Sequence, residues 1–138
     1  MTFRWPRSEA GQPNNVVAAG QVVAVTAPPG ATRLGFLGMA NHGPSTGQGT
    51  IRYTDGSTQP YTLGFSDWTG SGGVLAPGTR VVVVMPYRNS PGGETNDVET
   101  SVFAALVPID GCKTVAAVAL PTEVDHGDLH VFALALGQ

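Results

Sequence analysis

Turn-forming residues divide this chain into short apolar segments, and this spacing constrains the fold more than any other feature. The sequence contains 19 glycines and 11 prolines in 138 residues, yet hydrophobic residues still make up 41% of it. The apolar or alternating segments between the turns are about five to eight residues long, as is typical of an all-β sandwich. No segment keeps a helical period over the length that a globular helix needs. We therefore predict an all-β protein.

The positions of these segments predict an antiparallel β-sandwich of the jelly-roll type with about eight strands. The pair Asp55-Gly56 predicts a tight hairpin, because Asp-Gly supplies the positive φ angles that such a turn needs. Segment 80–85 is valine-rich and apolar at consecutive positions, so we expect it in the centre of a sheet. A further short edge strand is expected at 15–18. The predicted strands are 21–26, 33–40, 49–53, 59–65, 80–85, 100–107, 114–120 and 129–136.

Length and charge limit the class of protein to which this chain belongs. A chain of 138 residues with no break in composition is expected to form one domain, 1–138. Its 7 basic and 10 acidic residues give a net charge of −3, and the sequence holds no Lys/Arg cluster. We therefore expect neither a nucleic acid nor a membrane as partner. The longest apolar run, Val81 to Met85, is far shorter than the ~20 residues that span a bilayer, and the amino terminus lacks the apolar stretch of a signal peptide.

The loops between the predicted strands fall into two groups if successive strands run in opposite directions, because the connections then alternate between the two ends of the sandwich. One end carries loops 41–48 and 67–78, and the other carries loops 55–58, 87–99 and 121–128. Both ends gather polar side chains. Each end is therefore a candidate site.

Trp68 and Asp67 are the leading candidates for ligand binding at the first end. An exposed indole offers an apolar surface to the C–H face of a sugar ring, and a neighbouring carboxylate accepts hydrogen bonds from hydroxyls. Asn41 and His42 are expected to lie at the same end, on the other loop. The alternative interpretation of Trp68 is a core side chain at the end of an apolar strand.

At the second end, Tyr87, Arg88 and Asn89 lead from the valine-rich segment into a polar loop. A guanidinium and an amide in this position suit recognition of hydroxyls or of a carboxylate. The alternative interpretation is an internal salt bridge from Arg88 to one of three acidic residues of the same loop: Glu94, Asp97 or Glu99.

The remaining motifs give weak indications of metal binding or catalysis. Loop 94–99 has the oxygen ligands that Ca²⁺ prefers but lacks EF-hand spacing, so a solvated acidic loop is the default interpretation. Its candidate ligands are Glu94, Asn96, Asp97 and Glu99. His126 and His130 lie four residues apart but not on a helix, which disfavours zinc. The single Cys112 excludes an intrachain disulfide. We expect no resident cofactor and no catalytic residue.

Short motifs of a recognisable kind are spread over nearly the whole chain. They are Phe3-Arg4-Trp5-Pro6, Gly11-Gln12-Pro13-Asn14-Asn15-Val16-Val17-Ala18-Ala19-Gly20-Gln21, Leu34-Gly35-Phe36-Leu37-Gly38, Tyr53-Thr54-Asp55-Gly56-Ser57-Thr58-Gln59, Phe65-Ser66-Asp67-Trp68, Met85-Pro86-Tyr87-Arg88-Asn89, Lys113-Thr114-Val115, Ala119-Leu120-Pro121 and His130-Val131-Phe132-Ala133. As a set they resemble a β-sandwich domain of secreted actinobacterial enzymes, found notably beside glycoside hydrolases of the α-mannosidase type. Two features depart from that family: the chain lacks a segment that usually precedes Phe-x-Trp-Pro, and Asn14 stands where relatives often have Asp.

The resemblance implies a non-catalytic carbohydrate-binding accessory module, excised or truncated from a larger enzyme that is secreted. Its expected partners are a glycan and the parent catalytic domain. A hypothesis from another class is a structural or assembly sandwich without a ligand, since a fold alone does not determine function. A third hypothesis, a hydrolase, is disfavoured because a compact sandwich of this size seldom provides the cleft that paired carboxylates need.

A bare sheet edge near the amino terminus is expected to favour association between chains. Between Asn15 and Val25 there is no Lys, Arg, Asp, Glu or Pro, so the residues that normally prevent edge-to-edge pairing are missing. Either residues 2–13 cover this edge, with Phe3 and Trp5 as anchors, or two chains form a symmetric homo-oligomer through it.

Overall fold

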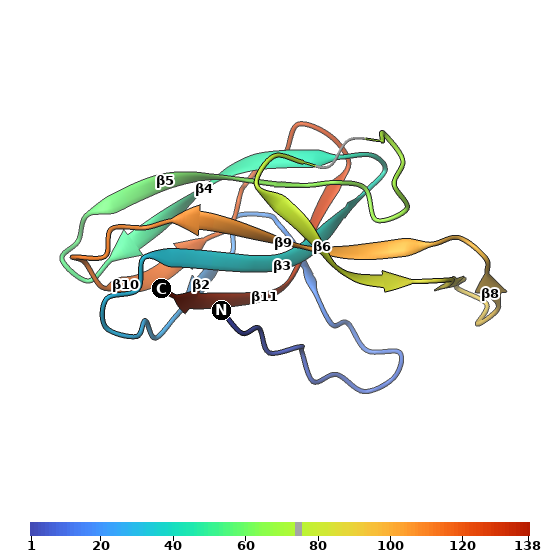
Figure 1. Ribbon diagram of the computed structural model, residues 1–138, viewed down its shortest axis with the longest axis horizontal. Helices are drawn as coiled ribbons and strands as arrows, with labels where there is room; N and C mark the ends of the chain where they lie inside the picture. The colour runs from blue at the N-terminus through green and yellow to red at the C-terminus, as the bar shows by residue number, and fades with distance from the viewer. Residues whose placement is uncertain (74–75) are drawn as a thin grey trace.

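The chain folds into two facing antiparallel sheets and a small separate hairpin (Figure 1). This computed structural model describes residues 1–73 and 76–138, in which eleven strands are present and no helix that is long and apolar enough to cross a membrane. Sheet A consists of β1 (Val16–Val17), β11 (Asp128–Gly137), β3 (Arg33–Asn41), β9 (Thr100–Pro108) and β6 (Thr79–Met85), in that order. Sheet B consists of β2 (Val22–Ala24), β10 (Val115–Ala119), β4 (Ser45–Tyr53) and β5 (Thr58–Phe65). The hairpin is formed by β7 (Arg88–Asn89) and β8 (Thr95–Asn96).

The strand order confirms the predicted jelly-roll sandwich. Strands β1 and β2 pair with β11 and β10 in the two different sheets, and β3 and β4 pair with β9 and β5 in the same way. This is the rolled ribbon of two Greek keys, with β6 added outside β9. The predicted hairpin at Asp55-Gly56 joins β4 and β5, but only Gly56 has a positive φ, of 86°, while the Asp55 carboxylate accepts a 2.8 Å hydrogen bond from the Ser57 amide.

The core lies between the two sheets and is built from alternate residues of their strands. Leu34 and Phe36 of β3 are fully buried, as are Ile51 of β4 and Phe65 of β5. Fully burying one such side chain contributes about 1.5–3 kcal/mol relative to leaving it exposed. The Phe36 ring stacks on Tyr61 with the ring centroids 5.2 Å apart, so the contact joins the two sheets directly.

The central position predicted for the valine-rich strand is wrong. Strand β6 is the edge strand of sheet A, where it pairs only with β9, and the four valines from Val81 to Val84 are 40–54% exposed. Sheet A has one strand more than sheet B, and β6 is that additional strand at its margin. A run of apolar residues predicts burial only where a neighbouring strand and a facing layer exist, and the sequence pattern does not reveal their absence.

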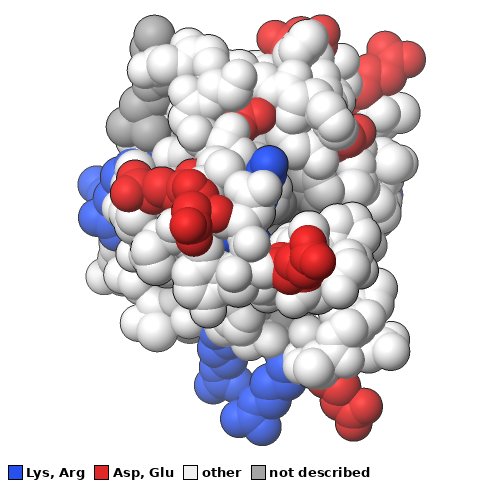
Figure 2. Space-filling view, turned by 90° about the vertical axis from the view of Figure 1, so that its right-hand side faces the viewer, with Lys and Arg blue, Asp and Glu red and all other residues white. Residues whose placement is uncertain are grey.

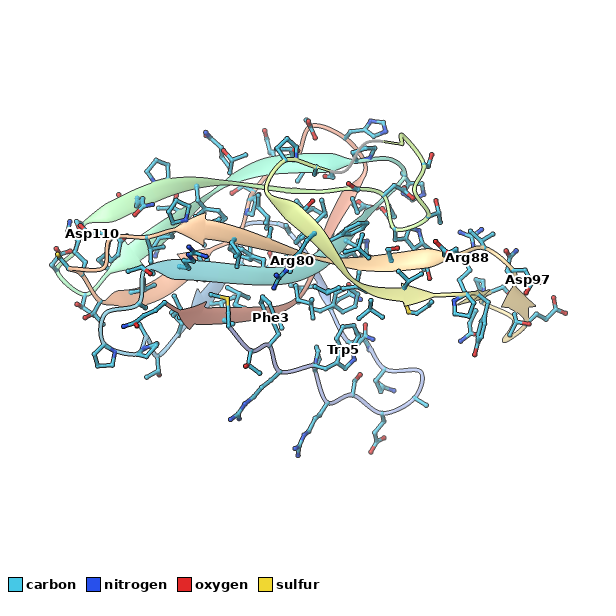
Figure 3. The ribbon with its side chains drawn as sticks, in the orientation of Figure 1. Phe3, Trp5, Arg80, Arg88, Asp97 and Asp110 are labelled. Carbon is cyan, nitrogen blue, oxygen red and sulfur yellow. The ribbon has the colours of Figure 1, made fainter. Side chains whose placement is uncertain are left out.

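The predicted division of the loops between the two ends is also wrong. Strand β6 runs in the same sense as β5, so β6 begins at the end of the sandwich opposite to the one where β5 ends; residues 74 and 75 of the connecting segment 66–78 lie outside the described residues. Loops 41–44, 86–99 and 120–127 therefore share one end with the start of that segment. In Figure 3, Arg88 and Asp97 lie at this end and Asp110 at the opposite one.

The amino-terminal residues pack on sheet A. The Trp5 ring stacks on Phe132 of β11 with the centroids 4.8 Å apart, and Phe3 lies beside Gly35 of β3 (Figure 3). A Cβ at Gly35 would lie 2.8 Å from the Phe3 ring, so this glycine makes room for the segment.

Strands β3, β11 and β5 approach one another closely at Gly38, so a methyl group added at this position is expected to lower the stability of the protein. At Gly38 a Cβ would collide with the backbone carbonyl of His130 and with the Phe65 ring. Gly38→Ala is therefore expected to lower the free energy of unfolding by about 1–3 kcal/mol in urea denaturation, because backbone and a buried ring cannot both move aside. Gly92→Ala is the matched control: this exposed glycine has no neighbour within 4 Å, so a change within about 0.5 kcal/mol is expected. Equal effects of the two substitutions would contradict this account of the core.

Candidate functional site

Segment 66–68 lies between two strands of the opposite sheet, and this position fixes the two candidate site residues Asp67 and Trp68. Strands β3 and β9 pair up to Gly38 and Phe103. Beyond that point, the Trp68 amide donates to the Ala40 carbonyl at 2.8 Å, and the Trp68 carbonyl accepts from the Ser101 amide at 2.7 Å. The chain leaving β5 in sheet B therefore becomes part of sheet A at this end, and Trp68 sits at the corner.

Asp67 joins two loops through its carboxylate, although it is only 3% exposed. One oxygen accepts from the Gly43 amide at 2.8 Å, and the other accepts from the Thr69 amide at 2.8 Å and the Thr69 hydroxyl at 2.6 Å. Burial opposes ionisation of this carboxyl, but the hydrogen bonds from Thr69, Gly43 and Ser71 outweigh that cost and hold its pKa below the ordinary value. The ionised Asp67 carboxylate therefore links loop 41–44 to the start of segment 66–78 through hydrogen bonds.

An open cavity of about 590 Å³ lies beside this corner and brings together predicted site residues from both supposed ends. Five of the seven predicted residues line it: Asn41, His42, Asp67, Trp68 and Arg88. A second hollow of about 380 Å³ shares Trp68 and Arg88 with the first and adds the other two, Tyr87 and Asn89. All seven thus border two hollows that share Trp68 and Arg88, although the predicted division of the loops had placed them at opposite ends.

The Arg88 guanidinium lies over the Trp68 ring, with Cζ 5.5 Å from the ring centroid. Such a cation–π contact contributes about 0.5–1 kcal/mol at an exposed site. In the described part of the chain Arg88 forms no ion pair with Glu94, Asp97 or Glu99, so the salt bridge considered from sequence is absent there. The guanidinium keeps its donors for a ligand while its flat face rests on the indole. Trp68 itself is partly buried. This exposure is intermediate between the two interpretations from sequence, an exposed sugar-binding surface and a core side chain.

Two histidines add polar groups to the cavity wall. His42 has a φ of 56°, the left-handed region that few non-glycine residues occupy and that often marks a functional position. Its Nδ1 lies 3.0 Å from the Asn41 side-chain oxygen and 3.5 Å from the Asp128 carboxylate. His126 lines the same cavity, where it packs against Gly43. Two hydrogen bonds fix loop 120–127 there. The Thr46 amide donates to the Asp125 carboxylate at 2.8 Å, and the Asp125 amide donates to the Thr46 carbonyl at 3.0 Å.

Most of the surface at this end is uncharged, and Figure 2 shows several acidic groups around one basic group in a hollow, with further basic groups at the left and lower margins. The exposed acidic residues here include Glu94, Asp97, Glu99, Glu123 and Asp125. The weak calcium candidates Glu94, Asn96, Asp97 and Glu99 are all exposed, on or just after the β7–β8 hairpin. Within residues 1–73 and 76–138, no three His, Cys, Asp or Glu side chains come close enough together to hold a metal ion.

Three polar residues that line the cavity were not among the predicted site residues: Thr69, Ser71 and His126, of which His126 had been considered only as a metal ligand at the other end. Thr69 and Ser71 follow Trp68 directly, so extending the motif by three residues would have included them. His126 had no such signal, because its loop was assigned to the other end of the sandwich. Comparison of the chain with protein-family models and with curated proteins gives no match. What this site does must therefore be argued from its own geometry.

The hydrogen bonds of the Asp67 carboxylate are expected to contribute to the free energy of unfolding in a way that depends on pH. Asp67→Asn is expected to lower the free energy of unfolding by about 1–3 kcal/mol at pH 7, because the amide nitrogen cannot accept from a backbone N–H. The pKa of Asp67 is lowered in the folded state, so its stabilisation is present above the unfolded-state pKa of ~3.9 and is lost as the pH falls through the folded-state value. The difference between wild type and variant should therefore shrink below about pH 4.

Urea denaturation of both proteins from neutral to acidic pH measures this difference. The matched control is Asp110→Asn, at an exposed carboxylate that accepts one hydrogen bond, 2.9 Å from the Cys112 amide. Its effect is expected to stay within about 0.5 kcal/mol. If Asp67→Asn is as stable as the wild type at pH 7, the hydrogen bonds of the Asp67 carboxylate do not stabilise the arrangement of the two loops.

Proposed function

We propose that this domain is a non-catalytic carbohydrate-binding accessory module, and that it keeps a linked glycoside hydrolase close to its glycan outside the cell. The observation that carries the proposal is the corner where Trp68 and Arg88 together border both hollows. A sugar ring needs an apolar surface for its C–H face and nearby donors and acceptors for its hydroxyls. The indole, the guanidinium and the Asn41 amide meet these needs within one open cavity.

The roles of the site residues follow from their surroundings. Trp68 supplies the apolar surface, and Arg88 and Asn41 supply hydrogen bonds to hydroxyls. His42 and His126 complete the wall, and Tyr87 and Asn89 extend the surface along the second hollow. Asp67 positions Trp68, because its carboxylate oxygens already accept hydrogen bonds from the protein.

The alternative hypothesis, a structural or assembly domain without a ligand, is supported by a different observation: the exposed apolar edge of β6. The two hypotheses differ in what they predict for a glycan. An assembly domain associates with itself and is not retained by polysaccharides, whereas a binding module is retained whether or not it associates.

Affinity electrophoresis through gels that contain mannan or other cell-wall polysaccharides tests the proposal. Wild type is expected to be retarded on at least one polymer, and Trp68→Ala should weaken binding about tenfold or more, which corresponds to about 1.4 kcal/mol or more. Trp5→Ala is the matched control, since this second tryptophan is 49% exposed and packs on Phe132 away from the cavity. It should bind as the wild type does.

Two outcomes would count against this assignment. If no polymer retains the wild type at millimolar sugar-unit concentration, the proposed function is wrong. If Trp68→Ala loses the ~3–5 kcal/mol that is typical of deleting a core aromatic side chain, Trp68 is a core residue and leaves the site. Chromogenic glycoside and ester panels test the non-catalytic part of the proposal: turnover that Trp68→Ala abolishes would overturn it.

A further inference from the structure

The strand β6 combines features that natural sheet edges usually avoid. Val81, Val82, Val83 and Val84 are 45%, 40%, 43% and 54% exposed, and no charged residue or proline interrupts the run from Val81 to Met85. Edges are normally protected by lysines, prolines, bulges or very short strands. A bulge does occur near Val82, but it leaves Val83 to Met85 in regular register with β9. Among the described residues, none forms a backbone pair with the outer side of this regular stretch.

The other sheet edges are protected. Strand β1 has two residues, and the segment from Pro6 to Asn15 borders it; the Asn15 side-chain oxygen lies 2.8 Å from His130 Nδ1 on β11. Strand β2 has three residues. Strand β5 is long but carries Pro60, which cannot donate a hydrogen bond to an added strand. Of the edges formed by the described residues, β6 is therefore the long one that carries no proline, and its bulge leaves the stretch from Val83 to Met85 regular.

We propose that β6 is an association surface through which two copies of this chain pair antiparallel, so that their two A sheets become one. A two-fold axis perpendicular to the sheet sets the strand against its own copy, and every contact is then made twice. Valine meets valine in any register near the centre of the strand, and β-branched cross-strand pairs are favourable. A second copy is thus the partner for which this surface is complementary by symmetry.

Charge also favours a second copy over other partners. The one charged residue of β6 is Arg80, which lies near the beginning of the strand (Figure 3). In an antiparallel pair the two copies of Arg80 lie at opposite ends of the joined strands, so they do not repel each other closely. A polar or acidic peptide would bury its side chains against the valines without a partner, which costs free energy.

The pairing has a consequence for the cavity that rests on the proposed function. Strand β6 ends at Met85, close to Tyr87 and Arg88 at the site. Antiparallel pairing therefore puts the two cavities at opposite ends of the joined sheet. A dimer of this kind holds two glycan chains apart from each other instead of gripping one chain twice.

Sedimentation velocity tests the association. Protein concentrations from about 1 μM to about 1 mM cover dissociation constants of moderate to weak dimers. Wild type is expected to pass from monomer to dimer without larger species. Val83→Lys should raise the dissociation constant at least about tenfold, because a charge on an edge strand opposes pairing. Val17→Lys on β1 is the matched control, since Val17 has the same side chain and the same 43% exposure, and it should dimerise as the wild type does.

The outcomes separate this proposal from the proposed function. If Val83→Lys melts at a lower temperature than the wild type, Val84→Lys at the most exposed of the four valines replaces it and should give the same loss of dimer. A wild type that stays monomeric at about 1 mM, an open-ended series of oligomers, or a dimer lost in Val17→Lys but kept in Val83→Lys would each overturn the proposal. Monomeric Val83→Lys that still binds polysaccharide supports both proposals, since binding then belongs to the cavity and association to β6.

Discussion

The insertion of segment 66–68 between β3 and β9 is the constraint on which the functional end of this molecule depends. Backbone amides at a sheet end need partners, and here they find them in a strand that arrives from the opposite sheet. The insertion turns the chain through the corner of the sandwich and leaves Trp68 at the mouth of a cavity. The Asp67 carboxylate then secures the next loop to the same corner, and the cavity wall is complete.

The site therefore rests on backbone pairing and on one buried charge, and the contacts of its exposed charges add little. The contact between His42 Nδ1 and the Asp128 carboxylate is 3.5 Å long and largely exposed, and exposed contacts of this kind contribute little to stability. Arg88 is held by the Trp68 ring and not by an acid. The proposed ligand therefore depends on the residues that line this cavity and not on the jelly-roll fold, because a fold by itself does not determine function.

The arrangement of strands places the cavity and the exposed valines of β6 in different parts of the molecule. The cavity is built from loops at one end, whereas β6 runs along the side of sheet A. The amino-terminal residues pack on the outer face of sheet A and beside β1, through Trp5 on Phe132 and the residues near Asn15. Residues of segment 66–73 lie near Val81, but the four valines from Val81 to Val84 remain 40–54% exposed.

The sequence by itself determined the strands, because strand length, alternation and turn residues are local properties. The eight predicted segments and the edge strand at 15–18 correspond to observed strands, and Asp55-Gly56 forms its hairpin, since each depends on neighbours along the chain. The two-residue strands β7 and β8 carry too few residues to show a pattern and were missed. The candidate residues Trp68 and Arg88 were also found locally, from side-chain chemistry next to a strand end.

Only the tertiary structure decided which strands are central and which loops meet. Consecutive valines look the same whether a sheet continues beyond them or stops, so the place of β6 at the edge depended on how many strands lie in each sheet. Likewise, the alternation of loops between two ends fails because β5 and β6 run in the same sense. The position of Trp68 depends on long-range hydrogen bonds to Ala40 and Ser101, so local patterns in the sequence identified Trp68 and Arg88 but did not place them together.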